Sequence, residues 1–287
     1  LNLLLLIAFG LKAAVFPLFS WLPDSYPAAP SPVSAVFAGL LTKVGVYAIV
    51  RTQTLLFPDS NRTLLLVIAG LTMVIGVLGA IAQSDMKRIL SFHIVSQIGY
   101  MIMGLALGGV AAISATIFYM LHHIPVKTSL FLVEGIVERE TGSSTLGRVS
   151  GLARRSGPMA ALFLIPALSL AGLPPFSGFL GKTAVVTEGI DQGSWWIVAA
   201  ALAVSLMTVV SMLKIWSGAF WGAPDPAPPE DEHAGILRKY PMMTAATTAI
   251  VSLTLVIAVF GGPLYRFCER AATDVTDTAA YTEAVIP

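Results

Sequence analysis

The sequence predicts an all-α polytopic membrane protein, and three observations support that fold class. The 287-residue chain is 56% hydrophobic and only 11% charged, with a mean hydropathy of +0.81. Soluble domains carry roughly 25% charged residues, so this chain has less than half the usual amount. Apolar runs recur along almost its whole length, and several reach the roughly 20 residues that a helix needs to cross a bilayer core. The runs lack the apolar–polar alternation of a membrane β-barrel.

The apolar runs predict about eight transmembrane helices. In chain order they are 1–20, 33–51, 63–83, 89–109, 111–137, 159–189, 195–221 and 241–263. We therefore expect a transmembrane domain over 1–263, followed by a weakly ordered C-terminal tail over 264–287. The acidic stretch 223–233 is expected to be a solvated loop. Because the chain opens on Leu1 inside an apolar run, with no charged leader, we expect it to be the C-terminal part of a longer protein.

Two of these helices are expected to be broken. The fifth contains "MLHHIPVK", in which Pro125 removes a backbone donor and crowds the carbonyl of Leu121. The sixth contains "AGLPPFSGFLGK", where two prolines lie between glycines, and the first runs into the proline-rich "FPLFSWLPDSYPAAPSP". Non-helical backbone survives at membrane depth only where protein or a wet cavity satisfies it. The breaks therefore indicate a transport pathway.

Basic residues in the loops predict an orientation, because cytoplasmic loops carry an excess of lysine and arginine. The loops after the first, third, fifth and seventh spans hold Lys87, Arg88, Arg139, Arg148, Arg154, Arg155, Arg238 and Lys239. The opposite side holds Arg51, Arg62, Arg266 and Arg270. The excess places the first set in the cytoplasm and the C-terminus outside.

The sequence carries no sign of a bound cofactor or metal. Its single cysteine, Cys268, excludes an internal disulfide framework and a CxxC metal site. It contains no GxGxxG, no P-loop and no HExxH. The net charge of +1 gives no reason to expect a nucleic-acid partner. We therefore expect no catalytic residues, no cofactor and no metal ligands in this chain.

Six ionisable residues are expected at membrane depth. They are Lys12, Lys43, His122, His123, Lys127 and Lys182. A charge at membrane depth is costly, and Lys43 shows this most clearly, because its neighbours in "GLLTKVGVYAIV" are small or apolar. A central lysine costs about 2.5–3.5 kcal/mol on insertion scales. Burial lowers the pKa of a lysine, and histidine already titrates near neutrality. A row of lysines and histidines joined by waters would therefore relay protons.

Structural explanations compete with this relay for several of the residues. Lys12 lies near the chain start and would be able to extend to an interface. His122 and His123 would also serve as core histidines bonded to broken backbone, and Lys182 would bond carbonyls freed by the "GLPPFSG" break. Glu134 follows Lys127 in the same span and would form a structural ion pair with it. Lys43 is too central to extend to an interface.

Four blocks of sequence resemble a known family. They are "LKAAVFPLFSWLPDSYPAAPSPVSAVFAGLLTKVGVYAIVR" (11–51), "SDMKRILSFHIVSQIGYM" (84–101), "HHIPVKTSLFLVEG" (122–135) and "AGLPPFSGFLGK" (171–182). In this order they resemble the antiporter-like membrane subunits, which include the large Mrp-type Na+/H+ antiporter subunits and the proton-pumping subunits of respiratory complex I. The resemblance extends to about residue 221. Within the family, "SFHIVSQIGYMIMG" and Lys182 are most similar to the D-type subunit of Mrp antiporters.

The resemblance implies a fold of fourteen helices in two inverted repeats, of which this chain would hold the last eight. It implies that Lys12 lies on the broken helix of the first repeat, paired with a glutamate on a preceding helix. Lys43 matches the bridging lysine of the next helix, and Lys182 the terminal ionisable residue of the second broken helix. His122, His123 and Lys127 match the region that links the half-channels. Gln97 departs from the histidine of several complex I members.

The resemblance further implies a proton-translocating subunit of a multisubunit antiporter that exchanges Na+ or K+ for protons in the bacterial cell membrane. Its partners would be the other subunits of that complex and the lipid bilayer. The alternative is a proton-pumping membrane subunit of an NADH:quinone oxidoreductase, whose redox chemistry would belong to partner subunits. A third interpretation, a structural scaffold with a vestigial channel, predicts that every buried lysine tolerates replacement by leucine.

Overall fold

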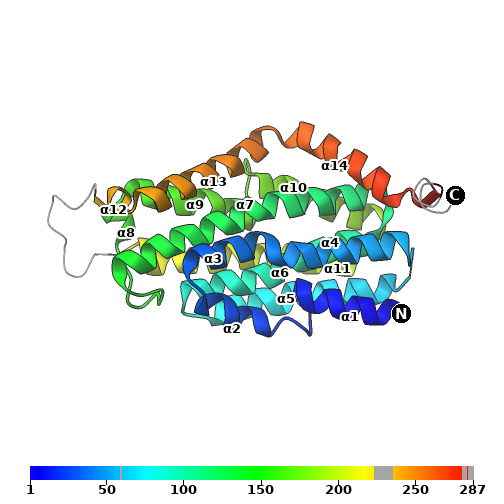
Figure 1. The fold of residues 1–287 in the computed structure, drawn as a ribbon, viewed down its shortest axis with the longest axis horizontal. Helices are drawn as coiled ribbons and strands as arrows, with labels where there is room; N and C mark the ends of the chain where they lie inside the picture. Colours follow the sequence, from blue (N-terminus) through cyan, green and yellow to red (C-terminus); the bar gives the residue numbers. More distant parts are fainter. Residues whose placement is uncertain (59, 223–234, 280–282, 284–287) are drawn as a thin grey trace.

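In the computed structural model, which describes residues 1–58, 60–222, 235–279 and 283, long apolar helices lie side by side along one direction (Figure 1). Within those ranges there is no β-strand, and one isolated bridge joins Asp85 and Thr145. Six helical stretches of the described residues are long and apolar enough to cross a membrane. They are α3–α4 with the π-helical turn between them (Ser31–Leu55), α5 (Arg62–Ala82), α6 (Met86–Leu107), α7 (Gly109–Thr141), α11 with its π-helical end (Trp195–Phe220) and α13 (Pro241–Val259).

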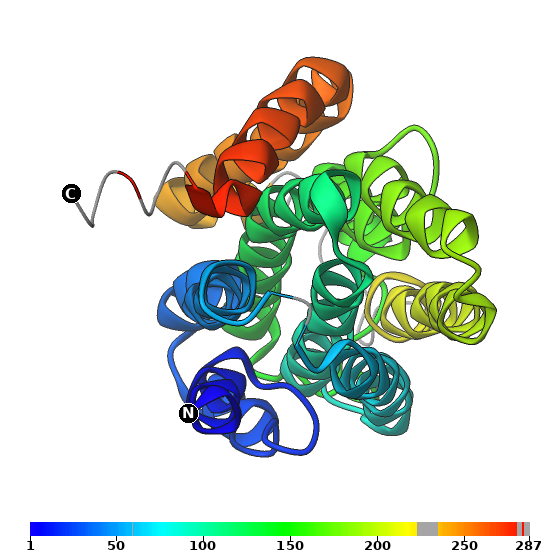
Figure 2. The same ribbon diagram turned by 90° about the vertical axis from the view of Figure 1, so that its right-hand side faces the viewer.

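The helices α6 and α7 form the centre of the bundle (Figure 2). Only Arg88 and Phe92 of α6 are partly exposed, so this helix is covered on every side. The 33 residues of α7 extend about 50 Å at 1.5 Å per residue, and it packs against α3, α6, α9, α10, α13 and α14. Polar side chains on these two helices are therefore placed in the interior.

One of the expected spans is a pair of shorter helices, and another is shorter than expected. The sixth span consists of α9 (Gly157–Ala171) and α10 (Ser177–Asp191). The first expected span, 1–20, contains α1 (Asn2–Ala13), and α2 (Trp21–Ala28) follows it in the proline-rich stretch. The interruption predicted in the fifth span does not occur, because α7 remains helical through Pro125. One proline removes a single backbone hydrogen bond. The packing of α6 and α10 along α7 holds the rest of the helix together.

The C-terminal part of the chain is helical further than the sequence indicated. Residues 264–276, which were expected to belong to a weakly ordered tail, instead form most of α14 (Gly261–Thr276). This helix packs on α7 and buries Cys268 and Ala272. The charged residues of α14 lie on its exposed side. They interrupt its apolar residues along the sequence, so this amphipathic helix contains no long apolar run. The expected acidic loop 223–233 lies outside the described residues.

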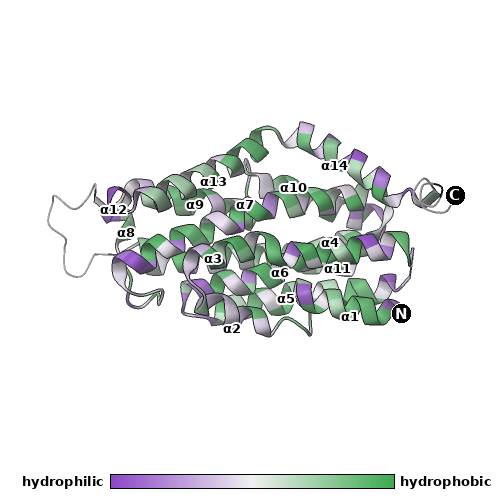
Figure 3. Ribbon diagram, viewed as in Figure 1, coloured by the Kyte–Doolittle hydropathy of each residue, from purple (hydrophilic) through white to green (hydrophobic). Residues whose placement is uncertain are grey.

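Polar residues gather at the two ends of the bundle, and hydrophobic residues cover most of the helices between them (Figure 3). The short helices α8 (Leu152–Arg155) and α12 (Gly235–Lys239) lie at one end, and α14 extends to the other (Figure 1). The arrangement is that of a helical protein that spans a bilayer several times. The ionisable residues inside it are therefore exceptions that require an explanation.

Candidate functional site

A row of buried ionisable side chains crosses the interior of the bundle. They come from α4, α6, α7 and α10, and each is at most 6% exposed: Lys43, His93, His122, His123, Lys127 and Lys182. None of the six takes part in an ion pair with the described residues. A buried charge without a paired partner is costly, so their presence indicates a function other than holding the bundle together.

Lys43 lies at the start of α4, directly after the π-helical turn Phe37–Leu41. Its Nζ atom donates to the carbonyl oxygen of Ala38 inside that turn, at 2.6 Å. The π-helical turn shifts the backbone bonding pattern, so this carbonyl accepts a bond from a side chain five residues further on. The ammonium thus has a single hydrogen-bond acceptor among the described residues and no carboxylate.

His123 and Lys127 lie four residues apart on α7 and share one side of it. Lys127 Nζ donates to the carbonyl oxygen of Leu90 on α6, at 3.1 Å. It does not pair with Glu134, which corrects the structural pairing considered from the sequence. Neither ring nitrogen of His123 has a hydrogen-bond partner among the described residues, and its ring stacks on Tyr119 at 6.3 Å between centroids. Buried polar atoms normally have hydrogen-bond partners, so His123 is an exception among the buried side chains described.

His122 and Lys182 meet at the break between α9 and α10. His122 Nδ1 is hydrogen-bonded to Ser177 Oγ at 2.8 Å, where α10 begins. Lys182 Nζ donates to the carbonyl oxygen of Ala171, where α9 ends, at 3.1 Å, and lies 5.0 Å from the Tyr100 ring centroid. The Lys182 contact matches the structural alternative for that residue, because it satisfies a carbonyl freed by the break, whereas His122 bonds a side-chain hydroxyl rather than broken backbone. His122 Nε2 nevertheless has no partner among the described residues.

Close contact at this break depends on Gly178. A Cβ atom at position 178 would lie 1.7 Å from the carbonyl oxygen of Ser169 and 3.1 Å from His122 Nε2. Only glycine lets the start of α10 cross the end of α9 so closely. The glycine of the "PFSG" motif therefore positions the break against His122.

The sequence analysis missed His93 as a member of this row. His93 lies on α6 and is fully buried; its Nε2 atom is hydrogen-bonded to Ser211 Oγ at 2.5 Å, while Nδ1 has no partner in the described part of the chain. The motif "SFHIVSQIGYM" contains the signal, a histidine inside an apolar run. One turn further on, Gln97 accepts a hydrogen bond from the Tyr119 hydroxyl, so this position is polar without being titratable.

Electrostatic interactions join the six residues into one connected group. His123 interacts with Lys43, Lys127, His122 and His93. His93 interacts with Lys127 and Lys182, and Lys182 interacts with His122. Lys43 on α4 and Lys182 on α10 therefore lie at the two ends of the group, with Lys127 and the three histidines between them. Like charges in a low-dielectric interior repel strongly, so the occupancy of each site depends on that of its neighbour.

Lys12 is the one predicted site residue that the structure does not bring to this row. It lies in the last turn of α1 on the exposed side, with no hydrogen bond or ion pair to the described residues. Lys214 on α11 is also outside the row: it bonds the carbonyls of Ile81 and Gln83 at the end of α5, at 2.8 and 2.6 Å. Within the described residues, no group of three or more histidine, cysteine or acidic side chains is placed to hold a metal ion.

The fold and the buried row define a polytopic helical membrane protein with a polar axis through its interior. The chain belongs to the NADH:quinone oxidoreductase/Mrp antiporter transmembrane family, whose model matches residues 1–208. It is 42% identical over 286 residues to the D-type subunit of the Na(+)/H(+) antiporter of Alkalihalophilus pseudofirmus, covering 98% of this chain and 57% of that protein. The corresponding D-type subunit of Bacillus subtilis is 34% identical, covering 100% of this chain and 58% of that protein.

The solved structures agree with this assignment. A chain in the structure of the Mrp complex from Dietzia sp. DQ12-45-1b superposes with a TM-score of 0.92 at 37% identity, covering 100% of this chain and 61% of that chain. A chain of respiratory complex I from Thermus thermophilus gives a TM-score of 0.83 at 26% identity, covering 96% of this chain and 58% of that one. This chain therefore spans between about half and two thirds of the length of the relatives it matches.

Proposed function

We propose that the chain belongs to the proton-translocating D-type subunit of a multisubunit antiporter that exchanges Na+ or K+ for protons. The observation that carries the proposal is the buried row from Lys43 to Lys182, which crosses from α4 to α10 without a single paired carboxylate among the described residues. The similarity to proteins named as D-type subunits of Na(+)/H(+) antiporters supports the choice of transport process. Its partners in the membrane would be the other subunits of such a complex.

Each member of the row would hold a proton and pass it to the next through intervening waters. A lysine or histidine in a desolvated site is costly in its charged form, so small changes at a neighbour shift where the proton lies. Repulsion between adjacent charges then favours release of one proton when another enters the row. His123 is suited to the middle of the relay because both of its nitrogens lack protein partners in the described structure.

Lys12 would complete the first half of the pathway through a part of the protein outside this chain. Its exposed position on α1 supports a location facing helices that precede residue 1. In the proposed fourteen-helix arrangement, a glutamate on one of those helices would pair with Lys12. This chain would then supply the last eight helices, counting α1–α2 and α9–α10 as one broken helix each.

The chain is proposed to lie in the bacterial cell membrane with its more basic end in the cytoplasm. That end carries α8 and α12, whereas α14 with Arg266 and Arg270 lies toward the other end (Figure 1). Because basic residues are retained in the cytoplasm, the C-terminal end of the described chain would be outside.

Replacement of Lys43 tests the proposal directly. In the complete complex, Lys43→Ala is expected to reach the membrane at the normal level and to lose antiport in everted vesicles, because it removes the first titratable group of the row. Lys239→Ala, which removes an ion pair with Glu140 and a contact with the Tyr240 ring outside the row, is the matched control and should retain full antiport. Wild-type antiport in the Lys43 variant would remove that residue from the pathway.

The similarity to a complex I chain supports a second candidate, a proton-pumping membrane subunit of an NADH:quinone oxidoreductase. Deletion of the gene separates the two candidates. Loss of cation/proton antiport with unchanged NADH:quinone activity favours the antiporter, and the reverse result favours the oxidoreductase.

A further inference from the structure

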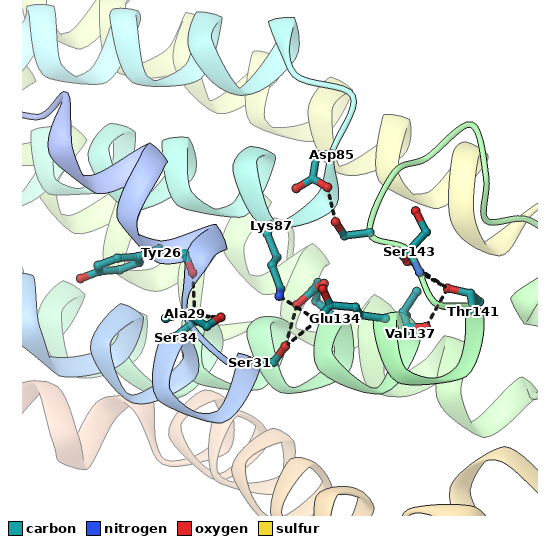
Figure 4. Close-up of polar contacts among 12 residues, drawn as sticks. Tyr26, Ala29, Ser31, Ser34, Asp85, Lys87, Glu134, Val137, Thr141 and Ser143 are labelled. Atoms are coloured by element: carbon teal, nitrogen blue, oxygen red, sulfur yellow. Dashed lines mark hydrogen bonds and ion pairs between the residues drawn. The ribbon is translucent and has the colours of Figure 1, made fainter.

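A second group of polar residues lies where α3, α6 and α7 meet, and Figure 4 shows Ser31, Lys87 and Glu134 pointing toward one another there. Glu134 and Glu138 lie one turn apart on α7, Lys87 is on α6, and Ser31 is the first residue of α3. Lys87 Nζ forms an ion pair with Glu138 Oε2 at 2.7 Å. The Ser31 hydroxyl lies 3.2 Å from Glu138 Oε2 and 3.4 Å from Glu134 Oε2, between the two carboxylates.

The two carboxylates differ in exposure and in partners. The Glu138 side chain is 38% exposed and is paired with Lys87. Glu134 is fully buried, and its Oε1 atom has no hydrogen-bond partner among the described residues. An ionised carboxylate that is buried without a paired cation costs several kcal/mol, and binding a proton removes that cost. Glu134 is thus the group of this cluster that is suited to hold a proton.

The backbone is shaped to bring Ser31 against Glu134. A Cβ atom at Gly135, the next residue on α7, would lie 2.5 Å from Ser31 Cβ and 3.1 Å from Ser31 Oγ. Glycine at this position therefore allows α3 to begin in contact with α7. A hydroxyl has a single hydrogen, so Ser31 can donate either to Glu134 or to Glu138 but not to both at once.

The cluster leads toward the buried row along two helices. On α7, Glu134 follows Lys127 by seven residues, which is two turns on the same side of the helix and about 10 Å along its axis. On α6, Lys87 is one turn from Leu90, whose carbonyl accepts from Lys127. The hydroxyl of Ser91, also fully buried, lies next to Leu90 and donates to the carbonyl of Lys87. Polar groups therefore continue from Glu138 at the surface to Lys127 inside.

We propose that Glu134 exchanges protons between water at this end of the bundle and the buried row, with Ser31 as the carrier between Glu138 and Glu134. This inference rests on the proposed function. A proton from water protonates Glu138; the Glu138 acid then gives a proton to Ser31 Oγ while the Ser31 hydroxyl gives its own to Glu134. The net change is one proton moved to Glu134, which passes it through water to the neutral amine of Lys127.

Glu134→Gln is the decisive variant, because it keeps the shape and the hydrogen-bonding capacity of the side chain but cannot titrate. In the complete complex in everted vesicles, we expect normal assembly and a loss of antiport of about a hundredfold or more, the range that removal of a proton-transfer group produces. Glu134→Asp should restore part of the rate. Glu140→Gln, which removes only the exposed pair with Lys239, is the matched control and should leave the rate unchanged.

A titration separates proton exchange from a purely structural role. The quantity to measure is the proton concentration that gives the half-maximal rate at the face carrying this cluster. Glu134→Asp should change this concentration by about threefold or more, whereas a packing defect would lower the rate alone. The charged groups facing Glu134 are Lys87 and Asp85 from the α6 side and Glu138 from α7, and they are unchanged in this variant. An unchanged half-maximal concentration would contradict the inference.

The outcomes distinguish this inference from the proposed function. If Glu134→Gln retains the wild-type rate while Lys43→Ala abolishes it, the inference fails and the function stands. If both variants retain the wild-type rate, the proposed relay itself fails. Should Glu134→Gln not accumulate in the membrane, Ser31→Ala decides the question, because it removes only the hydroxyl between the carboxylates; a wild-type rate there overturns the carrier step.

Discussion

At the scale of single residues, the lysines of the buried row differ from Lys87 in lacking a carboxylate partner in the described part of the chain, and not in burial alone. Lysines elsewhere in the chain have ordinary structural roles: Lys87 pairs with Glu138, and Lys214 satisfies two carbonyls at the end of α5. Lys43 and Lys127 are at least as buried as Lys87, yet each contacts a single carbonyl oxygen among the described residues. A lysine held this loosely can change its protonation without breaking an ion pair, which is what a relay requires.

His93 is the residue-scale prediction that depends most on the structure. It interacts with both Lys127 and Lys182, so its loss should weaken the connection between these two lysines. We expect His93→Gln to lower antiport by about tenfold or more with a normal amount of protein in the membrane, because the glutamine cannot accept and release the proton. Everted-vesicle antiport assays with quantified complex would measure this.

The control for this variant is Ser96→Ala, which removes a buried hydroxyl on the same helix that bonds only the carbonyl of Met73. That change costs a hydrogen bond, about 0.5–1.5 kcal/mol, but no titratable group, so transport should persist. Equal rates in the His93 and Ser96 variants would show that His93 is a core histidine.

At the scale of elements, the breaks in the helices place the ends of the row. The carbonyl of Ala171 is available to Lys182 because α9 stops there, and the Ser177 hydroxyl is available to His122 because α10 starts there. The π-helical turn before α4 gives Lys43 its acceptor in a comparable way. Irregular backbone thus supplies the acceptors that regular helices keep for themselves.

Gly178→Ala tests the α9–α10 break. Its Cβ atom would lie 1.7 Å from the Ser169 carbonyl oxygen, so the two helix ends would have to separate. We expect a destabilisation of about 1–3 kcal/mol or more, seen as a lower Tm of the purified complex and less protein in the membrane. Gly157→Ala, at the other end of α9 with no atom within 4 Å of the added Cβ, should behave like the wild type. Equal Tm values for the two variants would mean that the crossing is not tight.

At the scale of the whole molecule, the all-α membrane fold was predictable because apolar length is a strong signal, whereas the contacts between helices were not. The cost of a central lysine pointed to Lys43 before its surroundings were known. His93 was missed because α6 is buried all round, so its polar residues form no stripe that periodicity would detect. Lys12 was expected on the row but lies exposed, since a sequence does not tell which side of a helix meets a neighbour. Pro125 was expected to break α7, yet packing on several sides keeps the helix continuous.

The proposed orientation of the whole molecule is testable with two single-cysteine variants. Gly147 is exposed in the loop after α7, and Asp191 is exposed at the end of α10, at the opposite end of the bundle (Figure 1). The native Cys268 is fully buried and should give little background. With a membrane-impermeant maleimide, Gly147→Cys is expected to label in everted vesicles and Asp191→Cys in right-side-out cells, because the basic loops stay in the cytoplasm. The reverse pattern would invert the proposed topology and place the Glu134 cluster at the outer face, where protons from outside rather than from the cytoplasm would reach it.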